Sequence, residues 1–463
     1  MAVERQSMPT MTREGQTRTR YALCGLSSRA IGMYALPLLG NPEFAQYGNF
    51  SRYGELVAIL DIDPERVQGF NEAQDTDVSI YTPDQFGRMV QETHPDVVIV
   101  ASIDGTHAQY IVQALEHDLN VITEKPMVTD SRQATAVLEA ERRSRASVRV
   151  IHNSRYAQPH MQIKRMIMSG MLGRITNVEF VWNLDTYHGA SYFHRWNRDR
   201  SQSGGLTITK GCHHFDLINW FLDDIPVQVF AYGALNYYGA NSPHNPSRDG
   251  HSYSMEEQKR RSPYYQRWHA HGLEAPHDDH LMVRDRTFRL PYNVQYPSDT
   301  PMYIFDEDIQ IEDTYSAVVR YRSGASMTYS SNFSAPWEGY QLGINGTHGR
   351  LESVHITDPS RCPFPATDRQ TITYFPLFGE RQVYETRRAQ GTHGGADTLL
   401  KHEIFVEPIP ESKELGLSAS SLEGAYAVAV GEAIWRSVAS NQPINISDLL
   451  GTHTEAVERG AHV

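Results

Sequence analysis

Two groups of residues in this sequence have the chemistry to move a proton. The first is the triplet 124–126 (Glu-Lys-Pro), which follows a short apolar run. Pro126 fixes its own φ and favours an extended Lys125, so the ammonium group would be held rigidly where the chain leaves a strand. The second group is a histidine pair, His213 and His214. Histidine has an unperturbed pKa of ~6.5, which suits a general base at neutral pH.

Two further charged residues accompany the histidines. Lys210 precedes them, and Asp216 follows His213 by three positions, which places Asp216 and His213 on the same face of a helix. Asp216 could therefore orient or charge-balance His213, while Lys210 and His214 could supply further acid–base groups. The structural alternative is a histidine pair at a helix N-terminus, with one ring hydrogen-bonded in the core and the other solvated.

The elements around Lys125 predict a doubly wound, Rossmann-type α/β domain over residues 20–150. Apolar runs without polar alternation are typical of parallel strands buried on both faces. In such a sheet, ligands bind beyond the carboxyl ends of the strands, where Lys125 lies. An exposed loop cation is the alternative interpretation of this lysine. The expected strands are 21–24, 56–60, 97–101 and 121–123, and the expected helices are 109–115 and 131–144.

The turn after the first strand predicts a dinucleotide site. Gly25 allows the tight turn, and Ser27 and Ala30 stand where a G-x-G-x-x-G motif has its other glycines. A helix that begins there offers free N–H groups to a pyrophosphate. Asp61, at the end of the second strand, could accept hydrogen bonds from the ribose hydroxyls and repel a 2′-phosphate, which favours NAD over NADP. The alternatives are a plain strand–helix turn and, at Asp61, a helix cap.

The loop after the third strand is expected beside the nicotinamide half of the cofactor. Its alternative role is structural, because Asp104 or Thr106 could cap the next helix. The complete set of expected cofactor contacts is Gly25, Ser27, Ser28, Arg29, Ala30, Asp61, Ser102, Asp104, His107, Glu124 and Lys125.

Beyond residue 150 the pattern changes to half-exposed strands. It predicts an α+β domain with a large, mostly antiparallel open sheet over residues 151–463. Residues 236–306 have no clear period and are expected to form an irregular insertion. Residues 1–19 are expected to be a disordered tail. The expected strands are 177–182, 227–232, 316–321 and 325–329, with a late helix at 419–437.

Composition excludes several classes of protein. The 463 residues suffice for two domains, and 40% hydrophobic with 21% charged residues is typical of a soluble globular chain. No run approaches the ~20 apolar residues that span a bilayer. A net charge of −13 argues against nucleic acid or an anionic membrane as partner. Three separated cysteines, Cys24, Cys212 and Cys362, favour a reducing cytoplasm over a disulfide framework.

A cluster of histidines and acids in the insertion consists of residue types that can bind zinc. Its spacing matches no standard zinc module, so a solvated, histidine-rich loop is expected and no metal is predicted. The cluster consists of His269, His271, His277, Asp278, Asp279 and His280.

Taken together, these motifs resemble the glucose–fructose oxidoreductase/inositol dehydrogenase (Gfo/Idh/MocA) family. The matching segments are the Gly25 turn, 61–63, 104–107, 124–126 and the pair Gly204-Gly205 leading into 211–216. The resemblance implies a Rossmann domain, an α+β domain, a substrate between them and pairing through the open sheet into homodimers or homotetramers. Members mostly oxidise or reduce a secondary alcohol of a sugar, polyol or related ring.

The sequence departs from the family's D-x-G-x-H-x-x-D pattern, because Thr209 replaces its first aspartate. It resembles a K-x-x-H-H-F-D branch instead, which leaves His213 and His214 both open as the base, with His213 preferred. Besides Lys125 and His213, the expected substrate contacts are Tyr156, Arg195, Trp196, Arg198 and His393.

Three functions are compatible with these residues. The first is an NAD-dependent dehydrogenase of a sugar, glycoside or polyol, in which Lys125 and His213 handle the proton. The second is redox-assisted glycoside cleavage, in which a transient keto-sugar undergoes elimination and the cofactor is recycled. The third is a cofactor-binding sensor without turnover.

Overall fold

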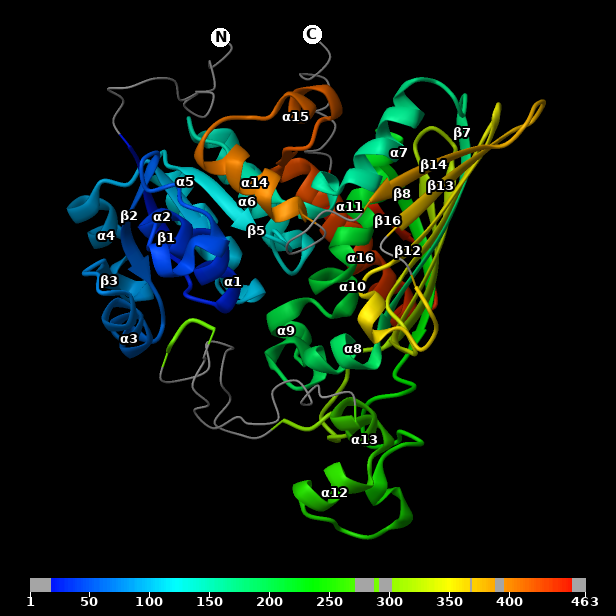
Figure 1. Cartoon of the computed structure of the whole chain (residues 1–463), viewed down its shortest axis with the longest axis horizontal. Coiled ribbons are helices and arrows are strands. Elements are labelled where there is room, and N and C mark those ends of the chain that lie inside the picture. The colour runs from blue at the N-terminus through cyan, green and yellow to red at the C-terminus, as the bar shows by residue number, and fades with distance from the viewer. Residues whose placement is uncertain (1–17, 271–286, 291–301, 367–368, 388–394, 452–463) are drawn as a thin grey trace.

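Two sheets organise the chain (Figure 1). The computed structural model describes residues 18–270, 287–290, 302–366, 369–387 and 395–451. The N-terminal sheet has seven strands in the order β15-β6-β5-β4-β1-β2-β3, parallel except for β15. Its strands are β1 (Thr19–Cys24), β2 (Gly54–Leu60), β3 (Ser79–Tyr81), β4 (Val97–Val100), β5 (Asn120–Glu124), β6 (Val148–Ile151) and β15 (Ala419–Ser420).

This sheet confirms the predicted doubly wound α/β fold, including the four expected strands, and adds strands that the apolar pattern did not predict. β3 is short, with only Tyr81 buried. β6 contains Arg149, whose buried guanidinium donates to Glu403 at 2.6 Å, so a charge interrupts its apolar run. The associated helices are α1 (Ser28–Ala30), α2 (Leu36–Leu39), α3 (Pro64–Gln74), α4 (Phe86–Thr93), α5 (His107–Glu116) and α6 (Ser131–Arg143).

The second sheet has nine strands, and every pairing is antiparallel except that of β7 with β10. It confirms the predicted large, mostly antiparallel sheet. Its order is β14-β13-β12-β11-β7-β10-β9-β8-β16. The strands are β7 (Ile175–Asp185), β8 (Pro226–Ala234), β9 (Thr314–Tyr321), β10 (Ser326–Ala335), β11 (Gly339–Gly346), β12 (Gly349–Ile356), β13 (Arg369–Pro376), β14 (Gln382–Arg387) and β16 (Ile444–Asn445).

Helices cover the side of this sheet that faces the Rossmann domain, as Figure 1 shows for α7, α11 and α16. Strands β9 and β10 alternate buried and exposed residues, as expected of a sheet covered on one face. The helices of this half are α7 (Gln158–Met168), α8 (Thr186–Phe193), α9 (Arg200–Ser203), α10 (Leu206–Thr209), α11 (Gly211–Leu222), α14 (Ala396–Phe405), α15 (Pro410–Leu415), α16 (Ser421–Ser440) and α17 (Ile446–Leu450).

The C-terminal half contacts the Rossmann domain through several segments, among them β15 and α14. Strand β15 pairs with β6 at the edge of the sheet and leads into α16, which begins at a capping box of Ser420 and Glu423. Helix α14 contacts the other side, where Lys401 Nζ donates to the carbonyls of Gly32 and Tyr47 at 3.0 and 2.8 Å. These contacts set the two halves on either side of a cleft.

The described part of the 236–306 insertion contains two helices, α12 (Met255–Arg261) and α13 (Pro263–Ala270). Its start is held by Asp313, whose carboxylate accepts the backbone N–H groups of Asn236, Tyr237 and Tyr238 at 2.7–3.0 Å. Before these helices, residues 236–254 contain only the short 3-10 helix Pro246–Asp249, so the described part combines short helices with irregular chain. Among the helices of the described chain, none has the length and apolar character to cross a membrane.

Candidate active site

A cleft of about 500 Å³ lies at the carboxyl ends of the Rossmann strands, and its lining combines residues of both halves. Gly25 forms the turn after β1 with φ +93°. A Cβ there would stand 2.4 Å from Ser102 Cα, so only glycine allows this approach of β1 to the end of β4. Ser27 caps the following helix, since its Oγ accepts from Ala30 N at 3.1 Å. Ser28 also lines the cleft, whereas Ala30 is buried behind it.

Asp61 lies at the end of β2 and lines the same cleft. Its Oδ2 accepts the N–H of Leu26 at 2.7 Å, and its Oδ1 accepts the N–H of Asp63 at 2.9 Å. These bonds fix the carboxylate beside the Gly25 turn. Each carboxylate oxygen has a further lone pair, so Asp61 can still accept from ribose hydroxyls. The glycine turn and this acid fit a dinucleotide.

Arg29 and Glu124 line the cleft as expected, but both are already engaged with protein partners. Glu124 Oε1 accepts from Arg29 Nε and from Tyr34 OH, both at 2.8 Å. Arg29 also donates to Asp397 of α14 at 2.7 Å. The glutamate of the 124–126 triplet thus links the cofactor turn to the C-terminal half.

Lys125 faces the cleft from the end of β5, and its Nζ donates to the carbonyl oxygen of Thr209 at 3.0 Å. The Lys125–Pro126 peptide bond is cis. Thr209 ends α10, directly before the segment that carries Lys210 and His213. The bond therefore ties the lysine of one half to the histidine-bearing helix of the other.

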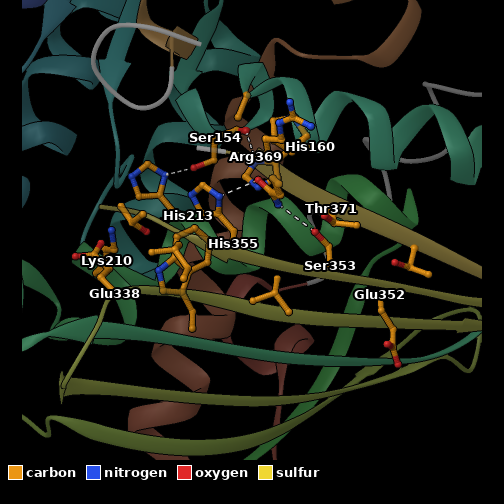
Figure 2. A pocket seen from close by; sticks show the side chains of 18 residues that line it. Ser154, His160, Lys210, His213, Glu338, Glu352, Ser353, His355, Arg369 and Thr371 are labelled. Carbon is orange, nitrogen blue, oxygen red and sulfur yellow. Dashed lines mark hydrogen bonds between the residues drawn. The ribbon is translucent and has the colours of Figure 1, made fainter. Parts of the chain in front are cut away.

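Lys210 and His213 line this cleft and also a second cavity of about 400 Å³ (Figure 2). His213 Nδ1 lies 3.4 Å from Ser154 Oγ. Burial lowers the pKa of Lys210, although nearby Glu338 acts to raise it. Burial acts to raise the pKa of Glu338, but His188, Lys210 and Arg361 outweigh it and lower that pKa to about 2.

His214 has a different environment from its neighbour. It is fully buried, lies 2.8 Å from Tyr329 OH through Nδ1, and stacks on Trp182 with ring centroids 4.3 Å apart. Burial lowers its pKa well below the usual value. It lines neither cavity.

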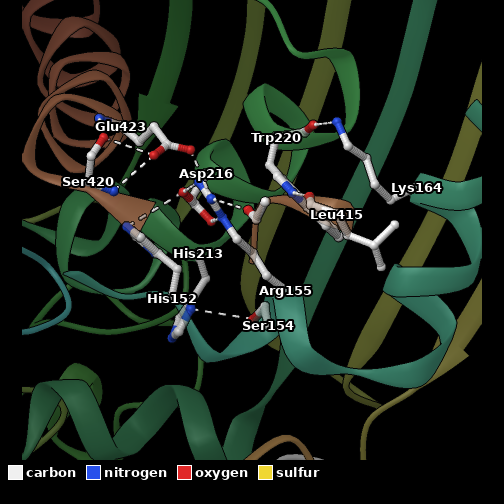
Figure 3. Close-up of polar contacts among 11 residues, drawn as sticks. His152, Ser154, Arg155, Lys164, His213, Asp216, Trp220, Leu415, Ser420 and Glu423 are labelled. Carbon is white, nitrogen blue, oxygen red and sulfur yellow. Dashed lines mark hydrogen bonds and ion pairs between the residues drawn. The ribbon is translucent and has the colours of Figure 1, made fainter. Parts of the chain in front are cut away.

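Asp216 is held by Arg155 in a bidentate ion pair of 2.6 and 2.9 Å, with both side chains about 1% exposed (Figure 3). Arg155 also contacts Glu423 of α16 at 2.8 Å. His152 Nε2 lies 3.6 Å from Asp216, and its ring meets that of His213 edge-on at 6.4 Å between centroids. Asp216 thus belongs to a buried charge cluster beneath His213.

Asp104 brings a buried carboxyl to the same cleft. Burial raises its pKa to about 6, although His107 and Lys125 act to lower it. Its Oδ2 has no hydrogen-bond partner among the described residues. Ser102 and His107 also line the cleft, and the His107 ring bridges the carbonyls of Ser102 and Pro126 at 3.1 and 2.9 Å.

Of the other expected substrate contacts, Arg195 and Trp196 line the cleft, whereas Tyr156 and Arg198 line neither cavity. The Tyr156 hydroxyl donates to Glu403 at 3.0 Å, and Arg198 donates to Asp306 at 2.9 Å, so both are engaged in structural contacts. His393 lies outside the described residues.

Sequence reasoning missed several lining residues, because the signal for each is a contact between distant segments. Trp182 ends a predicted strand, but only the fold brings it beside Lys210, with Nζ 5.6 Å from the ring centroid. Glu338 lies between β10 and β11, where no motif marks it. Trp182 and Glu338 line the second cavity, and the residues of the cofactor cleft that were not predicted include Asn153, His188, Tyr192 and Asn197.

No group of three or more His, Cys, Asp or Glu residues within the described ranges is placed to hold a metal ion. Of the histidine cluster in the insertion, His269 falls within α13. His271, His277, Asp278, Asp279 and His280 lie outside the described residues.

Comparison with known proteins gives the same picture. Residues 19–152 match the model of an oxidoreductase family with an NAD-binding Rossmann fold, and residues 164–446 match the C-terminal alpha/beta domain of that family. YteT of Bacillus subtilis (strain 168), which carries the name of an oxidoreductase without a stated substrate, is 46% identical over 433 residues. This match covers 92% of the chain and 97% of YteT.

More distant relatives carry more specific names. An inositol 2-dehydrogenase of Rubrobacter xylanophilus is 27% identical over 184 residues, which cover 38% of the chain and 48% of that protein. The WlbA dehydrogenase of Bordetella pertussis, solved with NADH and UDP-GlcNAcA, shares the fold with a TM-score of 0.59 at 17% identity. That superposition covers 93% of the chain and 99% of WlbA. The chain is therefore a member of the Gfo/Idh/MocA oxidoreductase family.

Proposed function

We propose that this oxidoreductase uses NAD to act on a secondary hydroxyl of a sugar, glycoside or polyol. One observation carries the proposal: Lys125 and His213 converge on the cleft that also contains the Gly25 turn and Asp61. The relative named as an inositol dehydrogenase and the structure holding a nucleotide sugar are consistent with this substrate class.

Lys125 and His213 are proposed to act together on the reacting hydroxyl. When bound, the nicotinamide supplies the two-electron acceptor for the hydride. His213 is positioned to accept the hydroxyl proton, because it lies at the junction of the two cavities, whereas His214 is in the core. Lys125, held by the Thr209 carbonyl, can donate a hydrogen bond to the oxygen as negative charge develops on it.

The Arg155–Asp216 cluster is proposed to hold His213 in position. Its bidentate pair fixes the helix that carries His213, and His152 lies between the pair and the His213 ring. Asp216 is therefore proposed as a positioning residue for His213 rather than as a group that touches substrate.

Lys125→Met tests the proposal directly. Loss of a positioned acid–base group lowers turnover by about 10²–10⁴-fold. We expect such a fall in nicotinamide reduction with a carbohydrate panel, while NAD affinity measured by calorimetry changes little. Lys413→Met is the matched control, because Lys413 is an exposed lysine of α15 that lines neither cavity. Turnover of Lys125→Met equal to the wild-type rate would refute the role of Lys125.

Cofactor choice is proposed to depend on Asp61. A carboxylate at this position favours the ribose of NAD and repels the 2′-phosphate of NADP. Arg66 lines the same cleft and lies 3.9 Å from Asp63, so its charge is directed in part to that acid. We expect a higher kcat/KM for NAD than for NADP, and Asp61→Ser should reduce the ratio. A wild-type preference for NADP would contradict this assignment.

A further inference from the structure

The second cavity is next to the candidate active site. The proposed reaction assigns it no role. Its volume is about 400 Å³, and it meets the cofactor cleft at Lys210 and His213. Figure 2 shows it between the start of α7 and the strands β12 and β13. A substrate whose hydroxyl reacts between Lys125 and His213 therefore has room to extend into this space.

One wall of the cavity is a hydrogen-bonded network that the protein completes by itself. Gln370 donates through Nε2 to Tyr340 OH at 2.6 Å and to Ser353 Oγ at 3.0 Å. His160 Nε2 lies 3.1 Å from the same tyrosine hydroxyl, and His355 Nδ1 lies 2.8 Å from Gln370 Oε1. Ser353 accepts from Gln370 and is also hydrogen-bonded to Tyr340, which leaves a lone pair of its oxygen to accept from a ligand hydroxyl. This wall is therefore polar, and its Ser353 and Gln370 side chains are uncharged. The hydrogen bonds within the network hold these side chains in place.

Trp182 supplies a hydrogen-bond donor at the junction of the two cavities. Its ring is held between His214, at 4.3 Å between centroids, and Lys210, whose Nζ is 5.6 Å from the ring centroid. The side chain is buried and lines the cavity, yet its Nε1 has no hydrogen-bond partner among the described residues. A buried donor without an acceptor is unfavourable, so a ligand oxygen at this place would remove the penalty.

The remaining lining mixes apolar and hydroxyl-bearing residues with the charged side chains of Glu338, Glu352 and Arg369. Ala157 and Pro159 come from the start of α7, and Thr357, Thr371 and Thr373 come from the sheet side. Pockets of about 300–1,000 Å³ hold drug-sized ligands, which are larger than one hexose. Apolar contacts interspersed with donors and acceptors suit a pyranose ring, which has C–H faces and a rim of hydroxyls.

We infer that the second cavity binds the second sugar unit of a glycoside, so that a disaccharide or larger glycoside is the substrate rather than a free monosaccharide. The inference rests on the proposed function, because it takes the reacting ring to lie at Lys125 and His213. Trp182, Ser353 and Gln370 are the residues that would recognise the second unit.

Kinetics with matched sugars tests the substrate class. Nicotinamide reduction is measured for the full-length protein with NAD and with glucose, galactose, maltose, cellobiose and lactose. We expect at least one disaccharide to have a kcat/KM roughly tenfold or more above that of its constituent hexoses, as extra pocket contacts provide. A panel in which the free hexoses are used as well as every disaccharide would overturn the inference.

Two substitutions narrow the cavity from opposite sides. Ser353→Leu fills the polar wall, and Ala157→Phe narrows the opening from a half-buried position that tolerates a larger side chain. Each should raise KM for the preferred disaccharide roughly tenfold and leave the free hexose almost unaffected. Thr328→Leu, on an exposed position of β10 outside both cavities, is the control. Equal losses for hexose and disaccharide would place the reacting ring itself in the cavity and contradict the inference.

A binding measurement separates this inference from the proposed reaction. Calorimetric titration of the same disaccharides into NAD-loaded Lys125→Met reports binding without turnover. Binding that Ser353→Leu weakens roughly tenfold in this background would support the cavity even if no redox reaction were found. Disaccharide turnover with no effect of Ser353→Leu or Ala157→Phe on binding or KM would overturn the cavity assignment and leave the proposed function intact.

Discussion

Two parts of the candidate active site differ in whether their buried polar atoms have hydrogen-bond partners in the protein. At the end near the Gly25 turn, the acids have protein partners: Asp61 accepts two backbone N–H groups, and Glu124 accepts from Arg29 and Tyr34. Elsewhere in the site, Asp104 Oδ2 in the cofactor cleft and Trp182 Nε1 in the second cavity have no hydrogen-bond partner among the described residues.

The presence or absence of a protein hydrogen-bond partner indicates which of these side chains stabilise the fold and which are available to bind a ligand. Buried polar groups are nearly always hydrogen-bonded, so each exception needs an explanation. A group that is satisfied by the protein stabilises the fold, whereas an unsatisfied group at a cavity costs stability until a ligand binds. Beneath His213, by contrast, Arg155 holds Asp216 in a bidentate ion pair and also contacts Glu423.

Breaking that support should have the largest effect. Arg155→Met would leave Asp216 without its bidentate partner at a site that is 1% exposed, and removing one member of a buried pair costs about 3–5 kcal/mol. We expect a loss of that size in the free energy of unfolding in urea. Arg165→Met is the control, since Arg165 is a partly exposed arginine 3.5 Å from Glu414. Equal losses from both substitutions would show that burial of the pair does not matter.

Asp104→Asn should raise the free energy of unfolding of the ligand-free protein. The folded-state pKa of about 6 is above the ordinary value of 3.8, so the fold favours the protonated acid and stability falls as pH rises through this window. The difference corresponds to about 3 kcal/mol at most above pH 6. Urea unfolding at pH 4 and pH 7.5 should show the gain only at the higher pH. A loss of stability at pH 7.5 would mean that Asp104 is satisfied after all.

Glu124→Gln should lower the free energy of unfolding, whereas Asp104→Asn should raise it, although both substitutions exchange an acid for its amide. Glu124 accepts a charged hydrogen bond from Arg29 and a second bond from Tyr34, and such bonds contribute about 1.5–3 kcal/mol. We expect destabilisation of about 2 kcal/mol, measured by urea unfolding at pH 7.5. If both substitutions shift stability in the same direction, the contrast between the two ends of the site is wrong.

The smallest stability change is expected for Trp182→Phe. It removes an N–H without a partner, so the free energy of unfolding should change by less than about 1 kcal/mol. KM for the preferred carbohydrate should nevertheless rise. Trp435→Phe is a matched control, because Trp435 Nε1 is also buried without a hydrogen-bond partner in the described part of the chain but lies outside both cavities. An unchanged KM in Trp182→Phe would show that this donor does not meet substrate.

Much of the cofactor end could be predicted because its signals are local. A glycine after a strand, an acid at the end of the next strand and Lys125 before a proline all lie within short segments whose strand positions follow from apolar runs. Helix α11 was not delimited in advance, but the spacing of His213 and Asp216 was sufficient to suggest one face. Strands β11–β14 were missed, and with them the whole wall that carries Ser353 and Gln370.

By itself the sequence determined the fold class, the cofactor turn and the presence of Lys125 and His213, because each depends on neighbouring residues. Only the tertiary structure decided which histidine faces the cavities and that Asp216 pairs with Arg155. It also decided that Asp104 Oδ2 and Trp182 Nε1 have no hydrogen-bond partner within the described ranges. Hydrogen-bond satisfaction and burial depend on contacts between segments far apart in the chain, and no local pattern encodes those contacts.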